Sequence, residues 1–216
     1  MGVDVEEEKQ LAAEAAAAMV DNGMRVGLGT GTTVVHLLPA LANRKLDLCC
    51  VATSPATEQA ARQLGLRVED FTMDRLDMAI DGADQINPEG WLVKGGGAAH
   101  TREKLVAATA ERFVVIVDST KPVAALYPPV PLELLVFGLA STLERLGPVR
   151  LRDVPLSPDG GVIADFVGPV GDPADLAARL GATPGVVEHG LFPPQMVTTI
   201  LVGRGRSVER IELAGR

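Results

Sequence analysis

The order of apolar and polar positions predicts strands that alternate with helices over the first 120 residues or so. Short apolar runs such as "MRVGLG" at 24–29 and "LDLCCVAT" at 46–53 have strand character, and stretches with helical composition separate them. This alternation predicts an α/β fold: a mainly parallel, Rossmann-like sheet with helices on both faces. The expected strands are 24–29, 46–53, 76–81 and 112–119, and the expected helices are 5–20, 32–44, 54–65 and 98–111.

Individual residues predict where some of these helices begin and end. Ser54 is a good N-cap, Pro55 suits the first helical position and Gly65 is typical of a helix stop. Pro39 lies within the expected helix 32–44 and predicts that this helix is kinked or ends near it.

From about Tyr127 the pattern changes to the order β-α-β-β-α-β, which predicts a small α+β ferredoxin-like domain. The β-branched run "VTTILVG" at 197–203 then returns to the main sheet. We therefore expect a Rossmann-like catalytic domain of residues 1–126, completed by the returning strand 198–216, and a small α+β domain of residues 127–197 that serves self-association. The small domain's expected strands are 132–137, 149–154, 161–167 and 186–192, and its expected helices are 140–147 and 172–181.

Composition narrows the class of partner. Hydrophobic residues make up 47% of the 216 residues and charged residues 22%, which is typical of a folded globular protein. A net charge of -8 and 3% aromatic residues argue against a nucleic-acid partner. The start "MGVDVEEEK" lacks a signal pattern, and no apolar stretch reaches the ~18 residues of a membrane span, so a cytoplasmic protein without membrane contact is expected.

Metal and covalent chemistry have little support in the sequence. Cys49 and Cys50 are adjacent in an apolar run and are expected to be buried thiols in a reducing compartment. The three histidines are scattered without metal-ligand spacing, and Ser119 has no histidine beside it for a nucleophilic triad. The carboxylates discussed below could hold Mg²⁺ in principle, but a lysine among them would compete with the ion, so we expect a metal-free site.

The carboxyl ends of the expected strands carry the polar and glycine-rich segments, where ligands bind in such folds. The first is "GLGTGTT" at 27–33, whose glycines, hydroxyls and helix-start N–H groups can hold a phosphate. Its G-x-G-x-G spacing is neither the dinucleotide nor the P-loop pattern. A purely structural turn and a nucleotide site stay open, although a phosphate on a smaller molecule fits best.

The second segment is "DGAD" at 81–84, at the end of an expected strand. Gly82 permits a sharp exit, so that Asp81 and Asp84 can both point into a cleft above the sheet. The alternative is that these two residues cap turns or the next helix.

The third segment is "KGGGAAHTREK" at 94–104. Lys94 precedes three glycines, Gly95–Gly97, whose bare N–H groups at a helix entry can stabilise an oxyanion or a phosphate. The alternative for Lys94 is an exposed ion pair of little consequence. Lys121 and Lys9 could add cations at the same edge, or they could be ordinary surface lysines.

Glu103 follows on the helix that this glycine loop begins. Val106 and Ala107 share its face, so the carboxylate is expected to be partly desolvated, which raises its pKa and makes it a better base. The alternative is a solvated charge balanced by Arg102 and Lys104.

Taken in order from Lys9 to Val202, the motifs "GLGTGTT", "TSPATEQAA", "DGADQI", "KGGGAAHTREK", "VDSTK" and "PGVVEHGLF" resemble ribose-5-phosphate isomerase of the A type. The resemblance implies reversible interconversion of D-ribose 5-phosphate and D-ribulose 5-phosphate in the non-oxidative pentose phosphate pathway. It also implies that no cofactor is needed and that the protein is a homodimer or a tetramer.

The resemblance further implies a role for each motif residue. Glu103 would move a proton between C2 and C1 through an enediolate, and Lys94 with the glycine amides would stabilise the oxyanion. Asp81 and Asp84 would position or shuttle the hydroxyl protons. The substrate-binding residues implied are Thr30, Gly31, Thr32, Thr33, Asp81, Gly82, Ala83, Asp84, Lys94, Gly95, Gly96, Gly97, Lys121 and Lys9.

The chain departs from the family pattern in four places. Gln85 stands in place of a glutamate and His100 in place of an apolar residue, and both are expected to alter substrate affinity. The turn 159–161 and the segment "FPPQMVTTI" differ in or beside the small domain and bear on its assembly contacts. Two other functions stay open: a related sugar-phosphate isomerase-deaminase or lactonase, and a non-catalytic sugar-phosphate sensor, which would need a DNA-binding segment that the chain has no room for.

Overall fold

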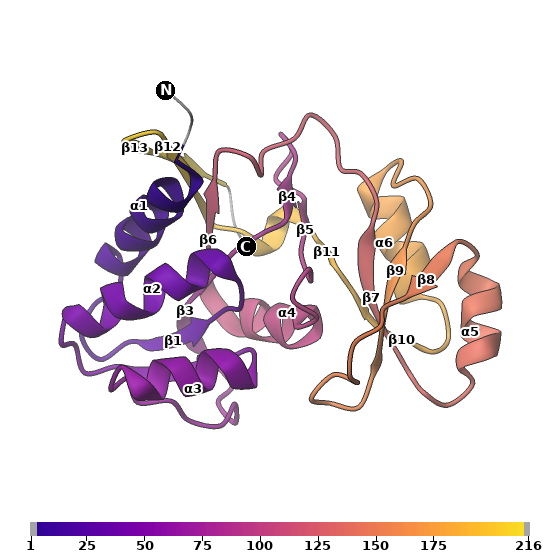
Figure 1. The fold of residues 1–216 in the computed structure, drawn as a ribbon, viewed down its shortest axis with the longest axis horizontal. Coiled ribbons are helices and arrows are strands. Elements are labelled where there is room, and N and C mark those ends of the chain that lie inside the picture. The colour runs from indigo at the N-terminus through magenta and orange to yellow at the C-terminus, as the bar shows by residue number, and fades with distance from the viewer. Residues whose placement is uncertain (1–3, 214–216) are drawn as a thin grey trace. The chain divides into compact units, whose positions relative to one another are not determined.

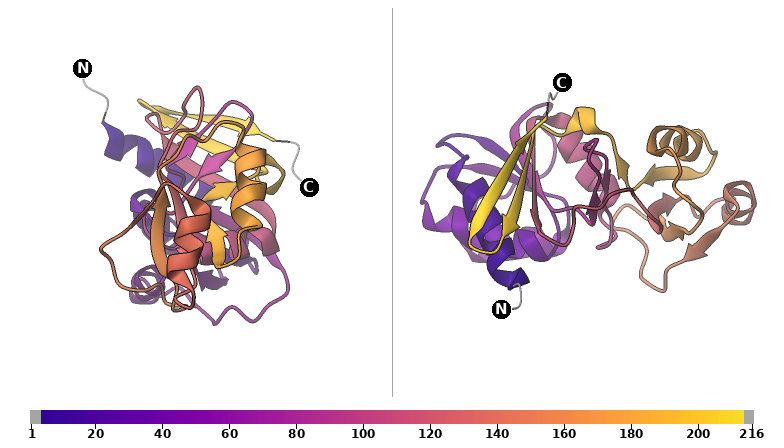
Figure 2. Two further views of the ribbon diagram at one scale, coloured as in Figure 1. Left: turned by 90° about the vertical axis from the view of Figure 1, so that its right-hand side faces the viewer. Right: turned by 90° about the horizontal axis from the view of Figure 1, so that it is seen from above.

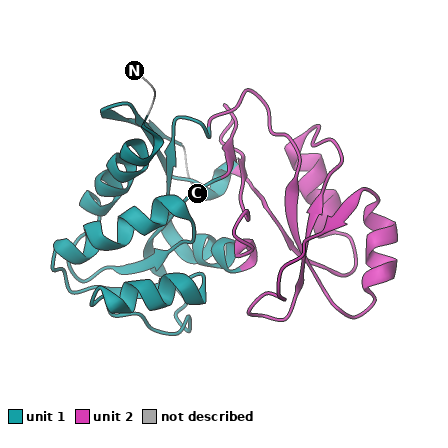
Figure 3. Cartoon of the chain, in the orientation of Figure 1, with its two compact units in different colours: residues 1–83, 102–121, 194–216 teal, residues 84–101, 122–193 magenta. Residues whose placement is uncertain are grey.

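The computed structural model describes residues 4–213, which form two compact units (Figure 3). Unit 1 holds the chain up to Ala83, Arg102–Lys121 and the chain from Pro194, and unit 2 holds Asp84–Thr101 and Pro122–Pro193. The chain passes from unit 1 to unit 2 inside "DGAD" and returns inside "KGGGAAHTREK". Segments 84–101 and 122–126, expected in the catalytic domain, therefore belong to unit 2 with the small domain, and 194–197, expected in the small domain, belongs to unit 1. The ends of the expected catalytic domain, 1–3 and 214–216, lie outside the described residues.

Unit 1 is built on a six-stranded sheet in the order β13-β12-β6-β3-β1-β2 (Figure 1). Every neighbouring pair is parallel except β12 and β13, which form an antiparallel hairpin at one edge. The expected mainly parallel α/β fold is thus confirmed. The elements of unit 1 are α1 Val5–Ala18, β1 Arg25–Leu28, α2 Thr32–Asn43, β2 Cys49–Ala52, α3 Pro55–Gln63, β3 Leu76–Asp81, β6 Ala110–Asp118, η1 Pro194–Met196, β12 Thr199–Arg204 and β13 Ser207–Glu212, with most of α4 His100–Thr109.

Helices cover both faces of the main sheet (Figure 2). Alternate strand residues, such as Val26 and Ile80, join the core that α1 and α2 complete. Gly27 faces the other way, where a Cβ atom would overlap the side chain of Val106 on α4. Glycine at this position therefore allows α4 to pack closely on the strands.

Helix α2 continues past Pro39 to Asn43, so it does not end at the proline. The buried side chains of Leu37, Leu38 and Leu41 lie on both sides of Pro39 in the core of unit 1. Their burial offsets the roughly 3 kcal/mol that an interior proline costs a helix.

Unit 2 contains a four-stranded antiparallel sheet in the order β10-β7-β9-β8, with α5 and α6 packed on one face. The chain order β-α-β-β-α-β is as expected for the small α+β domain. A second sheet, β11-β5-β4, was not expected from the sequence. The elements are β4 Gln85–Ile86, β5 Leu92–Val93, β7 Val130–Leu134, α5 Leu139–Leu146, β8 Val149–Leu151, β9 Val162–Phe166, α6 Pro173–Gly181, β10 Val186–His189 and β11 Leu191–Phe192.

The segment 186–192, expected as one strand, breaks at Gly190 into β10 and β11. The Gly190 N–H donates to the carbonyl of Pro131 at 2.7 Å, and its own carbonyl accepts from the N–H of Lys94 at 2.8 Å. A Cβ atom at Gly190 would overlap the Lys94 carbonyl, so this close crossing of two backbones depends on glycine.

Among residues 4–213, none of the helices is both long enough and apolar enough to cross a membrane.

Candidate active site

Asp81 stands at the end of β3 and holds the loop that follows β1. Its Oδ1 accepts hydrogen bonds from the N–H of Thr30 at 3.0 Å and the N–H of Gly82 at 2.7 Å. A Cβ atom on Gly29 would overlap the Asp81 carboxyl group. Asp81 is buried at the strand end, as the sequence predicted. Its hydrogen bonds also stabilise the loop after β1.

The side chain of Thr30 belongs to a cluster of hydroxyl groups. Its Oγ1 lies 2.8 Å from the Thr53 hydroxyl and 2.9 Å from that of Ser54, and the Thr57 hydroxyl donates to the carbonyl of Gly29. Ser54 also caps α3, as the sequence predicted. This cluster ties the loop after β1 to the loop after β2.

The start of α2 has the character of an anion site. Gly31, the N-cap residue, has a φ of 138° and supplies no side-chain cap, and the first turn carries no acidic residue. Gly31 and Thr32 are exposed, while Thr33 is buried. The N–H groups of a helix start attract phosphate when no side chain competes for them.

Glu103 lies in the first turn of α4 and is only 3% exposed. Val106 and Ala107, on the same side of the helix, are buried as well. The interpretation of Glu103 as a solvated surface charge is therefore wrong, and the apolar surroundings that a desolvated base needs are present.

Lys9 is buried on α1 and pairs with Glu6, whose Oε1 lies 2.7 Å from the Lys9 Nζ. His36 of α2 approaches the other Glu6 oxygen at 3.0 Å. The hydrogen bond from Lys9, and then that from His36, lowers the pKa of Glu6 below its ordinary value. Lys121 is half-buried, and its N–H bonds back to the carbonyl of Asp118 in the turn after β6.

Glu8 is a buried carboxylate that was not predicted from the sequence. Its two oxygens accept from the N–H of Ser119 at 3.0 Å and the N–H of Gly205 at 2.6 Å. Burial raises the pKa of Glu8, but the hydrogen bonds from these N–H groups lower it by a larger amount. The net pKa of Glu8 therefore lies below the ordinary value. Glu8 thus fastens α1 to the turn that carries Lys121.

In unit 2, Lys94 is 2% exposed, which excludes the interpretation as an exposed surface ion pair. Its N–H bonds to Gly190, and its Nζ lies 5.4 Å from the centre of the Phe192 ring. A cation over an aromatic face gains electrostatic stabilisation where little water reaches it.

The glycine loop is less bare than the sequence suggested. The N–H of Gly96 donates to Oδ2 of Asp84 at 2.9 Å, so this amide already has an acceptor. Asp84 is exposed, and its own N–H bonds to the Val93 carbonyl at 2.8 Å. Gly95 has a φ of +106° and Ala98 a φ of +60°, so the loop turns twice through the left-handed region that favours glycine.

His100 is completely buried at the start of α4. An added Cβ on Gly95 would lie 2.8 Å from the His100 Nδ1 and 2.8 Å from the Cβ of Pro131. His100 therefore fills the space behind the glycine loop, in the place of the apolar residue that the family pattern has.

Gln85 is buried and makes a reciprocal pair with the backbone of Tyr127. Its amide nitrogen donates to the Tyr127 carbonyl and its amide oxygen accepts from the Tyr127 N–H, both at 2.9 Å. This departure from the family pattern has a structural use within unit 2.

The two units thus carry different parts of the predicted site. Unit 1 brings together Asp81 and the loop 30–33, and it also holds Lys9, Lys121 and Glu103. Unit 2 brings together Asp84, Lys94 and the loop 95–97. No group of three or more His, Cys, Asp or Glu residues within 4–213 is arranged to hold a metal ion.

Known proteins are similar to this chain in both sequence and fold. The profile of the family described as Ribose 5-phosphate isomerase A (phosphoriboisomerase A) matches residues 49–207. A ribose-5-phosphate isomerase A of Caulobacter sp. (strain K31) is 43% identical over 206 residues, covering 88% of this chain and 91% of that protein.

Two solved structures support the same assignment. Ribose 5 phosphate isomerase A from Neisseria gonorrhoeae superposes with a TM-score of 0.93 at 28% identity, covering 99% of this chain and 100% of that one. A D-ribose-5-phosphate isomerase in complex with phospho-erythronic acid gives 0.91 at 31% identity, covering 97% and 99%. The resemblance of the ordered motifs is confirmed: the chain belongs to the ribose 5-phosphate isomerase A family.

Proposed function

We propose that the chain interconverts D-ribose 5-phosphate and D-ribulose 5-phosphate, as the names of its relatives indicate for those proteins. The observation that carries the proposal is the burial of both charged residues of the glycine-loop motif, Lys94 and Glu103. Buried charges are costly, so a chain that keeps a lysine and a glutamate nine residues apart in a buried state has a use for them.

In the proposed reaction Glu103 removes the proton from C2 of the aldose. The C–H electron pair forms the C1–C2 double bond of an enediolate, and the negative charge moves to O1. The same carboxyl group then returns the proton to C1, while the hydroxyl proton on O2 passes to O1. Atoms and electrons balance within the substrate, so no redox cofactor enters.

We assign Lys94 to the developing charge on O1, because a desolvated cation stabilises an oxyanion most strongly where water is excluded. Asp81 and Asp84 carry the hydroxyl protons. The Gly96 N–H donates to Asp84 and so holds this carboxylate in place. The N–H groups of Gly95 and Gly97 are the loop's donors to the oxyanion in this proposal.

We assign the substrate phosphate to the start of α2, with Lys9 and Lys121 as its cations. The uncapped helix start supports this, and so does the absence of acidic residues from its first turn. Phospho-erythronic acid, bound by a structural relative, carries a phosphate and a carboxylate on a four-carbon chain and so resembles the charged enediolate.

The test is an assay of ketose formation from ribose 5-phosphate with the purified protein. The wild type is expected to be active, Glu103→Gln to lose at least ~100-fold in kcat with little change in KM, and Lys94→Ala to lose kcat/KM. Near-normal turnover of the glutamine variant would remove Glu103 as the base, and an inactive wild type would contradict the function itself.

The deaminase alternative would use a histidine in the catalytic cleft, and His100 is the one near the motifs. Its complete burial behind Gly95 gives that alternative no support.

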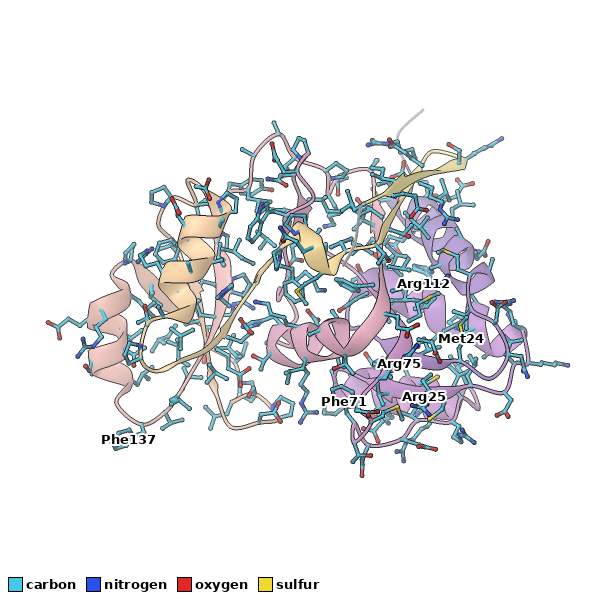
Figure 4. The ribbon with its side chains drawn as sticks, turned by 180° about the vertical axis from the view of Figure 1, so that it is seen from behind. Met24, Arg25, Phe71, Arg75, Arg112 and Phe137 are labelled. Atoms are coloured by element: carbon cyan, nitrogen blue, oxygen red, sulfur yellow. The ribbon has the colours of Figure 1, made fainter. Side chains whose placement is uncertain are left out.

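We also propose that the protein acts in the cytoplasm as a homodimer or tetramer assembled through unit 2. Two free thiols, Cys49 and Cys50, fit a reducing compartment. Phe137 is 93% exposed on the loop before α5, next to the exposed Val136 (Figure 4). Exposed apolar side chains of this kind mark protein interfaces. Light scattering should give a dimer or tetramer mass that Phe137→Ser lowers; a monomeric wild type would contradict the assembly.

A further inference from the structure

Arg152, directly after β8, connects the glycine loop to a buried carboxylate of the four-stranded sheet. Its Nη1 donates to the carbonyl oxygens of Gly95 at 2.9 Å and Gly96 at 3.1 Å. Its Nε and Nη2 donate to Oδ1 of Asp165 at 3.0 Å and 2.6 Å. The Arg152 side chain is only 17% exposed, so these charge-assisted bonds are largely shielded from water.

The sheet presents Asp165 to the loop because residues alternate between its two faces. Ala164 and Phe166 of β9 point to the core that α5 and α6 complete, so Asp165 between them points to the opposite face. Asp165 is buried on that face and fixes the guanidinium plane through two of its nitrogens.

Two carbonyl contacts determine the direction of two amides. A peptide unit is planar and trans, so its C=O and the N–H of the next residue point in opposite directions. Holding the carbonyl of Gly95 therefore sets the N–H of Gly96, which in turn donates to Asp84. Holding the carbonyl of Gly96 sets the N–H of Gly97 in the same way. Within the loop, the Gly95 carbonyl also accepts from the N–H of Ala98 at 3.0 Å. Arg152 adds contacts from outside the loop, which limit rotation because glycine peptides rotate more freely than others.

A second buried carboxylate holds the far end of the same segment. Glu133, on β7, accepts hydrogen bonds from the hydroxyls of Thr101 and Ser157. A Cβ atom on Gly161 would overlap Glu133, which accounts for the glycine in the departing turn 159–161. The segment from Gly95 to Thr101 is thus anchored at both ends by this one sheet face.

We propose that Arg152, oriented by Asp165, is a positioning residue that aligns the glycine amides and Asp84 for the isomerisation. The inference rests on the proposed function, since it names what the aligned groups serve. Arg152 touches loop carbonyls and not the reacting carbon atoms. Its removal acts through the loop geometry and lowers kcat more than substrate binding.

The central experiment compares Arg152→Ala with two controls. Arg150→Ala removes a guanidinium that contacts the same Asp165 at 3.4 Å. The Arg150 side chain is 70% exposed, and its described hydrogen bond goes to Asp165 and not to the glycine carbonyls. Leu176→Ala opens a cavity in the core of unit 2, under α6, and so lowers stability without touching the loop. Arg152→Lys, which retains the charge, measures rescue.

Arg152→Ala is expected to lower kcat by about 10- to 100-fold, with KM changed less than about 3-fold, because small misplacements of catalytic groups cost this much. The inhibition constant of phospho-erythronic acid should rise in parallel. Arg152→Lys should recover part of kcat, and Arg150→Ala should match the wild type. If Arg152→Ala does not fold, the double variant Arg152→Met/Asp165→Asn removes the same contacts without leaving an unpaired charge.

Hydrogen exchange of the segment 94–101 tests the inference independently of activity. Faster exchange in Arg152→Ala but not in Arg150→Ala is the expected result. Unchanged exchange together with unchanged kcat overturns the inference while leaving the proposed function intact. An equal loss of kcat in Leu176→Ala would overturn it as well, because the effect would then be one of general stability. An inactive wild type with loop exchange still dependent on Arg152 would instead contradict the function.

Discussion

Gly29 and Asp81 lie so close together that the place of a Cβ atom on Gly29 is already filled by the Asp81 carboxyl group. A displacement of Asp81 would be costly, because its carboxylate accepts hydrogen bonds from the N–H groups of Thr30 and Gly82. The conformation of the loop after β1 therefore depends on the position of Asp81 at the end of β3, and the reverse holds as well.

Gly29→Ala should consequently damage both the loop and Asp81. We expect kcat/KM to fall at least ~100-fold and stability to fall by about 1 to 3 kcal/mol from overpacking. Steady-state kinetics and urea denaturation measure the two effects. Gly181→Ala is the matched control, because a Cβ there has its nearest neighbour at 3.8 Å and the position is helical. Wild-type kinetics in Gly29→Ala would show that Asp81 is not needed in this position.

Glu8 predicts an acid-sensitive contribution to the stability of unit 1. Its net pKa lies below the ordinary value of 4.5, because the N–H groups of Gly205 and Ser119 outweigh the effect of burial. A carboxyl group whose folded pKa is lowered stabilises the fold above the unfolded pKa, and this stabilisation is lost as pH falls through the folded pKa.

Glu8→Gln should therefore lower the free energy of unfolding at pH 7 by about 1 to 3 kcal/mol, the usual cost of losing hydrogen bonds to a charged group. The difference from the wild type should shrink as pH falls below 4.5. Urea denaturation between pH 7 and pH 3 measures it, with Glu14→Gln on the exposed side of α1 as the control. A pH-independent difference would rule out the charge as the cause.

The main fold was predictable because its signals are local. Strand and helix periodicity gave the parallel sheet, and Ser54 and Pro55 marked the start of α3. Strands β4 and β5 have two residues each, too short for any periodic pattern. The path of α2 through Pro39 depends on tertiary packing, which outweighs a local preference for a helix end.

The candidate site divides in the same way. The strand-end rule pointed to Asp81, Asp84 and the loop 27–33 that we propose binds the phosphate, since each lies beside its own strand. This rule could not identify Arg152, because 57 residues separate it from Gly95. In the sequence, Arg152 resembles any other surface arginine. Pattern also left Lys94 ambiguous until its burial was known.

Removal of metal ions should leave the activity unchanged. The proposed reaction places the oxyanion on Lys94, and residues 4–213 contain no cluster of three or more His, Cys, Asp or Glu that could hold an ion. Ketose formation after exhaustive dialysis against a chelator should equal that of the untreated enzyme. Activity that is lost and then restored by Mg²⁺ would mean that the carboxylates bind an ion in the working enzyme.

Gln85→Glu restores the residue that the family pattern has, and it should cost stability rather than substrate affinity. The amide of Gln85 both donates to and accepts from the backbone of Tyr127. An ionised glutamate can accept from the Tyr127 N–H but cannot donate to its carbonyl, so a buried acceptor loses its partner and faces a negative charge. We expect the free energy of unfolding at pH 7 to fall by about 1 to 3 kcal/mol, with less loss at pH 4, where the carboxyl group becomes protonated and can donate.

Denaturation at the two pH values and KM for ribose 5-phosphate are the measurements, with the exposed Gln59→Glu as the charge-matched control. A changed KM at unchanged stability would instead mean that position 85 acts on the substrate.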